Sequence, residues 1–393
     1  MFRKMPFILL AVILLVILLD GFMSLSVKAF LYALSLSIKS AIIFVLPCII
    51  FMLLFKTLSK LASSATKIIL LILVGVCCSN FISTMISYNI GAAIYNLDLS
   101  IALPKDLIEL QPMWSFNLPK LIANDHAMFA GIILGIGCSF FVPRGSAKLS
   151  SYFDTIVDMI LRVITCVIPV FIAGFIVKLI HDQVMKSIIQ DYALVFVLVA
   201  AAQLSYIAFI YLAANQFKKA PFISSFKNML PAAIAGFGSM SSAAAMPLTI
   251  MGAEKNSNNP NLSRLVIPAT VNIHLIGDCF AIPIFAFAVM KNFGAPEPLF
   301  MSYLVFAMYF VMAKFSVAAI PGGGIIVMLP ILEGHLGFNS EMSSLITALY
   351  ILFDPVITCA NVCGNGGFAL VLSRLQGAFV KAKPATPTNG IAA

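Results

Sequence analysis

The sequence predicts an all-α polytopic membrane protein with eight transmembrane helices and two re-entrant helical hairpins. Three observations lead to this prediction. The 393 residues are 61% hydrophobic and only 10% charged, whereas soluble domains carry about 25% charged residues. Apolar segments long enough to cross a bilayer recur along the chain. Two further apolar segments are interrupted by serine, glycine or proline.

The apolar spans follow one another in a regular series. They lie near residues 5–20, 40–56, 68–93, 126–142, 153–178, 191–215, 264–290 and 342–373. The first has a basic start and a short apolar run, but no small-residue cleavage site follows it, so we expect a helix rather than a signal peptide. The more polar segment 94–125 holds Trp114 and is expected to be an external loop with interfacial pieces.

The basic residues are divided unequally between alternate connections. With the N-terminus inside, fifteen of the 24 Lys and Arg residues fall in cytoplasmic segments and five in outer segments. This bias follows the positive-inside rule and predicts that both termini are cytoplasmic. The cations do not cluster, so the net charge of +9 does not indicate a nucleic-acid partner. We expect contact with membrane lipid instead.

The first interrupted segment lies near 221–253. It has no charge between Asn228 and Ala253, yet its centre reads GFGSMSSAAAMP. Glycine and serine disfavour a continuous helix, and half of the run reaches only to the bilayer centre. Irregular backbone at membrane depth is tolerated only where protein or a watery cavity surrounds it. We therefore expect the chain to enter, turn at the serines and leave on the same side.

The second interrupted segment, near 299–337, repeats this design with Pro321 and three glycines in the middle of an apolar run. From the span count, the first hairpin enters from the cytoplasm and the second from outside. Two interrupted segments of opposite entry indicate a secondary transporter with inverted repeats and a binding site near the midplane. The simpler alternative is that both segments are kinked helices.

Ionisable side chains inside the spans are candidates for function, because a charge at bilayer depth is costly. Asp278 follows His274 by four residues, so we expect both on one face of a helix. Lys314 precedes the second hairpin tip. His274 could instead donate to a helix carbonyl, and Lys314 could extend to an interface.

Asp354 begins a polar stripe on the last span. Thr358 and Asn361 follow it on one helix face, and Asn365 lies one turn beyond, where it could also be a packing amide. The eight cysteines all lie in apolar stretches, and we expect free thiols. Cys359, Cys363, Cys279 and His274 could supply soft metal ligands, but packing is the simpler explanation and we expect no metal site.

Four motifs give the chain a resemblance to the dicarboxylate/amino-acid:cation symporter family, which includes archaeal aspartate transporters and excitatory amino-acid transporters. The family's hairpin tip SSSGTLP corresponds to SSAAAMP at Ser241–Pro247, and its GVPGAG to AIPGGG at Ala319–Gly324. Its NMDGT corresponds to HLIGD at His274–Asp278. Its last helix, DxxRTxxNVxGD, corresponds to DPVITCANVCGN at Asp354–Asn365. The resemblance covers nearly the whole chain.

The resemblance implies a homotrimer of elevator-type transporters, in which a moving transport domain carries substrate past a fixed scaffold. The implied division is scaffold helices at 1–67, a transport-domain helix at 68–93, scaffold helices with a transport-associated helix at 94–215, the transport core at 216–376, and a disordered cytoplasmic tail at 377–393.

The resemblance also assigns residues to the site. The implied substrate-binding residues are Ser241, Ser242, Pro321, Gly322, Gly323, Gly324, Asp354, Thr358 and Asn361. The positions expected to serve ion coupling are His274, Asp278, Lys314, Asn361 and Asn365.

Several family residues differ here. The arginine that pairs with an acidic substrate side chain is replaced by Ile357, so we expect a neutral amino acid. Two sodium-binding aspartates are replaced by Ile276 and Asn365, while Asp278 and Lys314 occupy positions that are uncharged in the family. We expect Lys314 to pair with Asp278 as a tethered cation, with His274 or Asp278 carrying a proton.

The sequence therefore predicts a symporter of the cytoplasmic (inner) membrane, not an enzyme, with no catalytic residues. Its substrate would be a small amino acid, preferably neutral, or a dicarboxylate. No cofactor is expected beyond the coupling cation, which would be H⁺ rather than Na⁺. A sodium-coupled glutamate, aspartate or dicarboxylate symporter and a non-transporting relative are the main alternatives.

Two unrelated functions are also considered. A channel with re-entrant filter loops would need repeated carbonyl or charge rings rather than single charged positions. An intramembrane aspartyl protease could use Asp278 and Asp354, but the G-x-G-D motif of such proteases is absent because Leu275, Ile276 and Gly277 precede Asp278.

Overall fold

The computed structural model describes residues 5–63, 67–96, 110–119, 122–182, 184–317 and 322–381, and these form helices without a β-strand among them. In chain order the helices are α1 Met5–Leu19, η2 Asp20–Phe22, α2 Leu25–Ser63, α3 Lys67–Asn96, α4 Asn124–Phe141, α5 Pro143–His181, α6 Val184–Ala214, α7 Lys219–Ser239, α8 Ser242–Asn256, α9 Pro260–Thr270, α10 Ile276–Asn292, α11 Phe300–Ala313, η3 Lys314–Ser316, α12 Gly323–Leu336 and α13 Ser340–Lys381.

Several helices are long and apolar enough to cross a membrane. Among the described residues, the five such spans are Leu25–Ser59, Leu70–Asn96, Pro143–Lys178, Tyr192–Ala214 and Ser340–Leu375. The other expected spans correspond to the shorter helices α1, α4 and α9–α10. The helical class is therefore confirmed, while the count of eight spans stays a prediction.

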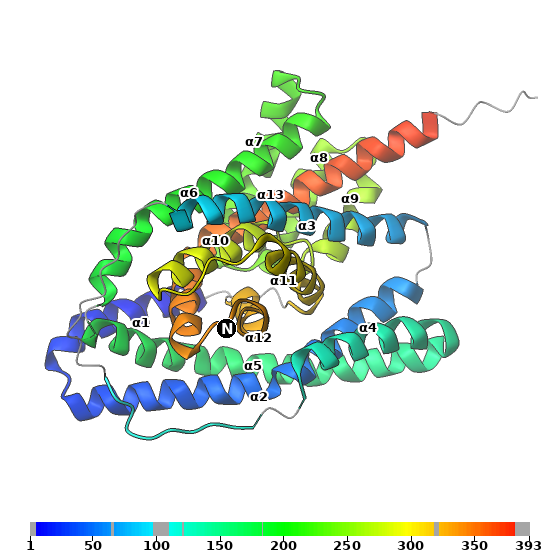
Figure 1. The fold of residues 1–393 in the computed structure, drawn as a ribbon. Coiled ribbons are helices and arrows are strands. Elements are labelled where there is room, and N and C mark those ends of the chain that lie inside the picture. Colours follow the sequence, from blue (N-terminus) through cyan, green and yellow to red (C-terminus); the bar gives the residue numbers. More distant parts are fainter. Residues whose placement is uncertain are drawn as a thin grey trace, which may run out of the picture.

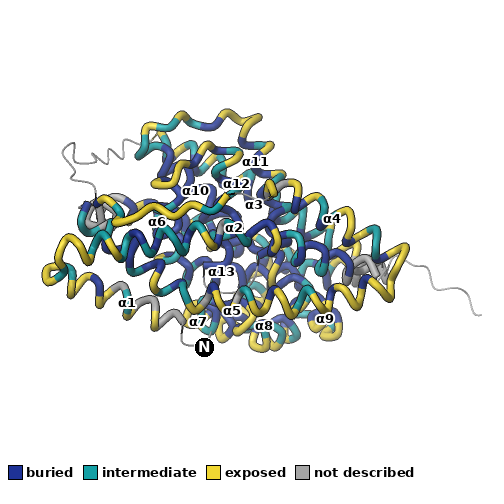
Figure 2. Tube along the Cα trace, turned by 90° about the horizontal axis from the view of Figure 1, so that it is seen from below, coloured by how far each residue is buried: buried dark blue, intermediate teal, exposed yellow. Residues whose placement is uncertain are grey.

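The helices form two groups (Figure 1). In the first, α2 packs against α4 and α5, and α1 packs against α5. In the second, α13 packs against α6, α7, α8 and α10, while α10 also packs against α3. The centre of the second group is the most buried part of the fold, since every residue of α10 from Ile276 to Met290 is buried (Figure 2).

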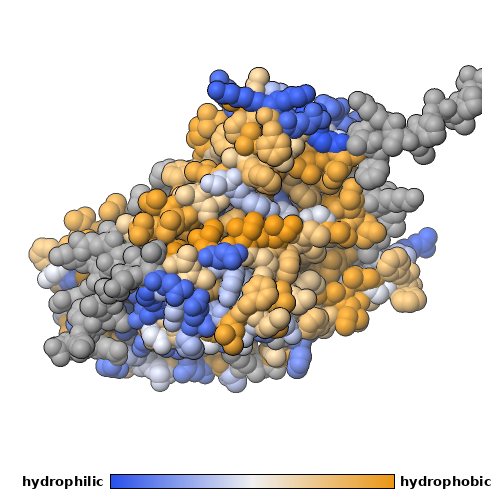
Figure 3. Space-filling model, turned by 45° about the horizontal axis from the view of Figure 1, so that its top comes forward, coloured by the Kyte–Doolittle hydropathy of each residue, from blue (hydrophilic) through white to orange (hydrophobic). Residues whose placement is uncertain are grey.

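The helices α2 and α5 are longer than the apolar runs that predicted them. Each has 39 residues, which corresponds to about 58 Å at 1.5 Å per residue. A hydrocarbon core is about 30 Å thick, so both helices must tilt or project beyond it. The face shown in Figure 3 is mostly apolar, with hydrophilic side chains gathered in separate patches, as expected of a surface that meets lipid.

The first interrupted segment is a helical hairpin. α7 ends where Met240 adopts a left-handed conformation with φ of 48°, and α8 begins after Ser241, whose hydroxyl accepts a hydrogen bond from Ala244 N. At the open end, Asn228 Nδ2 donates to Asn256 Oδ1 over 2.8 Å. The predicted turn at the serines is therefore confirmed, and the kinked-helix alternative is wrong for this segment.

The second interrupted segment is also a hairpin, formed by α11 and α12, which pack against each other. Between them lie η3 and a tip that includes Gly322, whose φ of 72° favours glycine. Pro321 lies outside the described residues. The side of the membrane from which each hairpin enters stays a prediction.

Two expectations about continuous structure are wrong. The span 264–290 is not one helix, because the chain leaves helical geometry between α9 and α10, from Val271 to Leu275. The last helix continues to Lys381, so residues 377–381 of the expected disordered tail are helical. The rest of that tail lies outside the described residues.

Candidate functional site

The site is built on the middle of α13, where four polar side chains follow one another along a single stripe. Asp354, Thr358, Asn361 and Asn365 are all buried, with at most 4% of each residue exposed. Their spacing keeps them on one side of the helix, as the sequence predicts. Buried polar groups need partners, and these come from α10 and the second hairpin.

Asp354 binds the tip of the second hairpin. Gly322 N donates to its Oδ2 over 3.0 Å, and Thr358 Oγ1 donates to its Oδ1 over 3.1 Å. Gly322 takes its left-handed conformation immediately before α12, so its amide belongs to the free N-terminal end of that helix. The described end of the tip thus contacts Asp354 through Gly322, and a helix N-terminus faces a carboxylate.

The first hairpin reaches α13 one turn further along. A Cβ on Gly236, one turn before the end of α7, would lie 3.3 Å from Thr358 O and 3.0 Å from Val362 Cγ2. Ser241 and Ser242 at the tip are buried, with 7% and 5% of each residue exposed. The two hairpins therefore contact neighbouring turns of α13.

The break between α9 and α10 is held by amide side chains from other helices. Asn80 of α3 donates to Ile273 O over 2.7 Å and accepts from Leu275 N over 3.2 Å. Gln203 of α6 donates to Gly277 O over 2.9 Å. The two Asn80 bonds satisfy backbone groups that a continuous helix would have paired internally, and Gln203 adds a bond to the first turn of α10.

α10 and α13 approach each other closely beside this break. A Cβ on Gly277 would lie 2.3 Å from Ile357 O, so only glycine fits. Gly277 N donates to Asn361 Oδ1 over 2.8 Å, and Asn365 Nδ2 donates to His274 O over 3.2 Å. Asn361 and Asn365 therefore join the α13 stripe to the beginning of α10.

Asp278, in the first turn of α10, is the most connected carboxylate of the site. Its Oδ1 accepts from the Tyr350 hydroxyl over 2.8 Å, and its Oδ2 accepts from Asn361 Nδ2 over 2.7 Å. Gly324 lies against it, since a Cβ there would be 2.1 Å from Asp278 Oδ1. The second hairpin therefore contacts both carboxylates through glycines, Asp354 through Gly322 and Asp278 through Gly324.

Lys314 supplies the positive charge. Its Nζ lies 3.4 Å from Asp278 Oδ1, and its side chain has no exposed surface. The ammonium also lies 4.4 Å from the centre of the Phe310 ring, within range of a cation–π contact. Within the described part of the chain, Nζ has no hydrogen-bond partner. The expected contact between Lys314 and Asp278 is present, and the alternative that Lys314 extends to an interface is wrong.

His274 does not share a helix face with Asp278, because it lies in the break before α10. Its Nε2 is 2.9 Å from Ser79 Oγ, and its ring packs on Phe368 at 4.6 Å between centroids. Its Nδ1 has no partner among the described residues. The contacts of the two side chains differ, which corrects the expectation of a common face.

Sequence reasoning did not find Asn80, Gln203 or Tyr350. The amides Asn80 and Gln203 lie inside apolar spans and are fully buried. Polar side chains within transmembrane helices commonly bond to neighbouring helices, so both could have been noticed. Nothing in the sequence indicates that their partners are the backbone groups of the α9–α10 break.

Comparison with known proteins places this geometry in context. The family model described as "Sodium:dicarboxylate symporter family" matches residues 5–375. Three proteins from different strains of Acinetobacter baumannii, each named "Serine/threonine transporter SstT", are 22% identical to the chain over 339 residues. The aligned regions cover 81% of this chain and 83% of each relative.

Proposed function

The chain belongs to the sodium:dicarboxylate symporter family, and we propose that it carries a small neutral amino acid across the cytoplasmic membrane together with a proton. The family consists of transporters rather than enzymes, and the multi-pass helical fold suits a secondary symporter for amino acids or dicarboxylates. The neutral substrate and the coupling proton go beyond this family assignment and are our proposal.

The observation that carries the proposal is the buried contact between Lys314 and Asp278. In the resemblance described above, family members bind sodium near these positions and have no charged side chain there. A lysine ammonium is a compact point charge, so it can occupy the place of a bound cation. If the Lys314 ammonium occupies that place, the site does not have to bind a sodium ion there.

The charges of the site favour one further positive charge. The carboxyl groups are Asp278 and Asp354, and Lys314 is the single ammonium among the described residues that surround them. With both carboxylates ionised, the buried site has a net charge of −1. A zwitterionic amino acid does not change that balance, whereas one bound proton neutralises it. Because a buried net charge is costly, we propose that the loaded site crosses with that proton bound. For symport, the proton must leave with the amino acid before the empty site returns.

The substrate class follows from α13. Ile357 is fully buried and stands where the family has an arginine that pairs with an acidic substrate side chain. An acidic side chain would enter a site without its cationic partner. The serine/threonine transporters that resemble this chain carry neutral substrates by name, and we propose the same class here.

The remaining roles follow the residues assigned from the resemblance. Asp354 would hold the substrate amino group, while Ser241, Ser242 and the Gly322–Gly324 tip would surround the carboxylate. We propose the elevator motion, the homotrimer, the domain boundaries and cytoplasmic termini on the same basis. A sodium-coupled dicarboxylate symporter is the alternative within the family.

Uptake into proteoliposomes tests the proposed substrate. Purified protein is reconstituted and given labelled L-serine under an inward proton gradient, with neutral and acidic amino acids as competitors. Uptake that unlabelled L-serine and L-threonine suppress, and that L-glutamate does not, supports the proposal. Equal competition by L-glutamate would overturn the neutral preference.

A further inference from the structure

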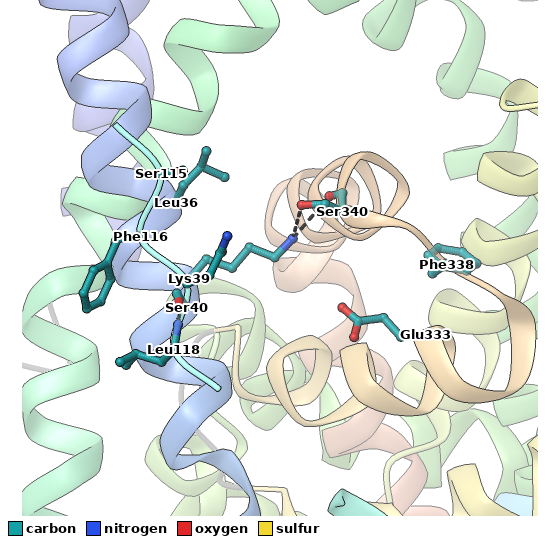
Figure 4. Close-up of a pocket in the computed structure, with 10 residues that line it drawn as sticks. Leu36, Lys39, Ser40, Ser115, Phe116, Leu118, Glu333, Phe338 and Ser340 are labelled. Atoms are coloured by element: carbon teal, nitrogen blue, oxygen red, sulfur yellow. Dashed lines mark hydrogen bonds between the residues drawn. The ribbon is translucent and has the colours of Figure 1, made fainter. Parts of the chain in front are cut away.

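A cavity of about 550 Å³ lies away from the residues of the candidate site. Its walls include Leu36, Lys39 and Ser40 of α2, Phe116 of the segment 110–119, Glu333 of α12 and Phe338 (Figure 4). Ligand cavities for small molecules commonly measure about 300–1,000 Å³. None of these residues contributes to the substrate and ion positions described above.

On the side of α2, the cavity wall is formed by the segment 110–119, which is hydrogen-bonded to that helix. Leu118 N donates to Ser40 Oγ over 2.8 Å, and Trp114 Nε1 donates to Ser37 Oγ over 2.9 Å. The Trp114 ring also packs edge-on against Phe30, with 5.3 Å between centroids. These contacts hold the segment 110–119 along α2, so the cavity is bounded by packed structure.

Lys39 places a positive charge in the cavity. Only 9% of the residue is exposed, and its Nζ donates to Ser340 O and Ser340 Oγ over 3.2 and 3.1 Å. Both hydrogen-bond partners are neutral oxygens, while Glu333 interacts with Lys39 electrostatically. An ammonium has three donors, so Lys39 can donate one more hydrogen bond to a ligand without leaving Ser340.

Glu333 places a negative charge in the same cavity. It is half-buried on α12, and its carboxylate is turned into the space between α12 and Lys39 (Figure 4). Ser343 Oγ lies at 3.5 Å from its Oε1. A cation and an anion therefore face one cavity, and Leu36, Phe116 and Phe338 add apolar surface.

The positive charge of Lys39, the negative charge of Glu333 and the apolar walls together indicate which kind of ligand fits the cavity. A simple anion would meet the Glu333 carboxylate, and a simple cation would meet the Lys39 ammonium. A compact zwitterion pairs its carboxylate with Lys39 and its ammonium with Glu333, and both contacts are charge-assisted. The apolar walls suit a small side chain.

We propose that this cavity is a second binding site for a zwitterionic α-amino acid, separate from the transport site. The choice of a neutral amino acid as the probe rests on the proposed function, but the site itself does not. Its walls come from α2 on one side and from α12 and α13 on the other, so a bound ligand links the two groups of helices. A ligand bound to both groups would therefore slow movement between them.

Isothermal titration of the purified full-length protein with L-serine tests the site. The wild type should show two binding events. Asp354→Asn, which weakens the transport site, should keep the second event. Adding Lys39→Met or Glu333→Gln to that variant should weaken the second event at least about tenfold, because each removes one charge-assisted contact.

Matched controls separate this effect from general damage. Lys28→Met removes another lysine of α2, which pairs with Asp20, and Glu341→Gln removes an exposed carboxylate near Ser340. Neither should alter the second event. If Lys39→Met fails to fold, Ser115→Trp fills the cavity from an exposed position and should abolish the same event.

Each outcome decides the proposal. Loss of all L-serine binding in Asp354→Asn overturns it, as does a second event that Lys39→Met and Glu333→Gln leave unchanged. Binding of glycerophosphoethanolamine but not of amino acids to Asp354→Asn also overturns it, since the cavity then takes a lipid headgroup. Second-site binding without proton-driven uptake would overturn the proposed function and leave the second site standing.

Discussion

At the scale of single residues, the proposed mechanism depends on the contact between Lys314 and Asp278. Both side chains are almost fully buried, and removing one partner of a buried ion pair typically costs about 3–5 kcal/mol. Lys314→Met should therefore lower the melting temperature clearly and reduce amino-acid uptake at least about tenfold. Thermal unfolding and proteoliposome uptake measure the two effects.

A second substitution separates charge from packing. Lys314→Met combined with Asp278→Asn removes both charges and should recover much of the lost stability, while uptake stays low because the tethered cation is absent. A Lys314→Met variant with intact, sodium-independent uptake would show that the tethered-cation account is wrong.

The residue at position 357 provides a test of substrate class. Ile357→Arg places a guanidinium in a fully buried position, where it is costly without an anionic partner. We expect lower stability that L-aspartate restores more than L-serine does, because aspartate supplies the bidentate carboxylate. Thermal-shift measurements with both ligands test this, with Ile357→Met as the uncharged control. Equal stabilisation by the two amino acids would contradict the assignment.

At the scale of elements, the second hairpin needs glycine where it meets Asp278. A Cβ at Gly324 would lie 2.1 Å from Asp278 Oδ1, whereas a Cβ at Gly334 of the same helix meets nothing within 4 Å. Gly324→Ala should cost about 1–3 kcal/mol and impair uptake, and Gly334→Ala should leave uptake unchanged. If both variants transport like wild type, the close approach of Gly324 to Asp278 is not required for transport.

The break between α9 and α10 depends on Asn80. Asn80→Ala leaves Ile273 O and Leu275 N without their side-chain partner, at a cost of about 1–3 kcal/mol for each buried group. Asn89 lies on the same helix but is exposed, and its Nδ2 donates to Met85 O of that helix. Chemical unfolding should show a large loss for Asn80→Ala and almost none for Asn89→Ala; equal losses would contradict this role.

The two hairpins could be predicted from sequence, but the α9–α10 break could not. Gly, Ser and Pro in the middle of apolar runs signal a turn directly, and the ends of the hairpins agree within a few residues. The break at Val271–Leu275 contains no Gly, Ser or Pro of its own. It is stabilised by Asn80 and Gln203, which are distant in sequence, so local patterns do not reveal it.

The candidate site shows the same limit. Asp278, Lys314 and Asp354 were found because charge is rare at membrane depth, and the contact of Lys314 with Asp278 is present. The sequence pattern predicts that His274 and Asp278 share a helix face. This is wrong because the helix is interrupted at Val271–Leu275. Tyr350 was missed, since a tyrosine in an apolar span has many ordinary packing roles.

At the scale of the whole molecule, the two groups of helices are the parts that we propose to move relative to each other. α2, α4 and α5 pack together, and α13 gathers α6, α7, α8 and α10. The boundary between the groups crosses the cavity between Lys39 of α2 and Ser340 of α13. Relative motion of the groups remains a prediction, and the second binding site would couple to it.

The most direct measurement is the equilibrium accumulation of labelled L-serine in proteoliposomes under separate proton and sodium gradients, with the membrane potential clamped at zero. The charge balance of the site predicts one proton per amino acid, so each pH unit should raise the internal-to-external ratio about tenfold. A sodium gradient alone should leave the ratio at one. Accumulation that follows the sodium gradient and ignores pH would contradict the account that Lys314 replaces a bound cation.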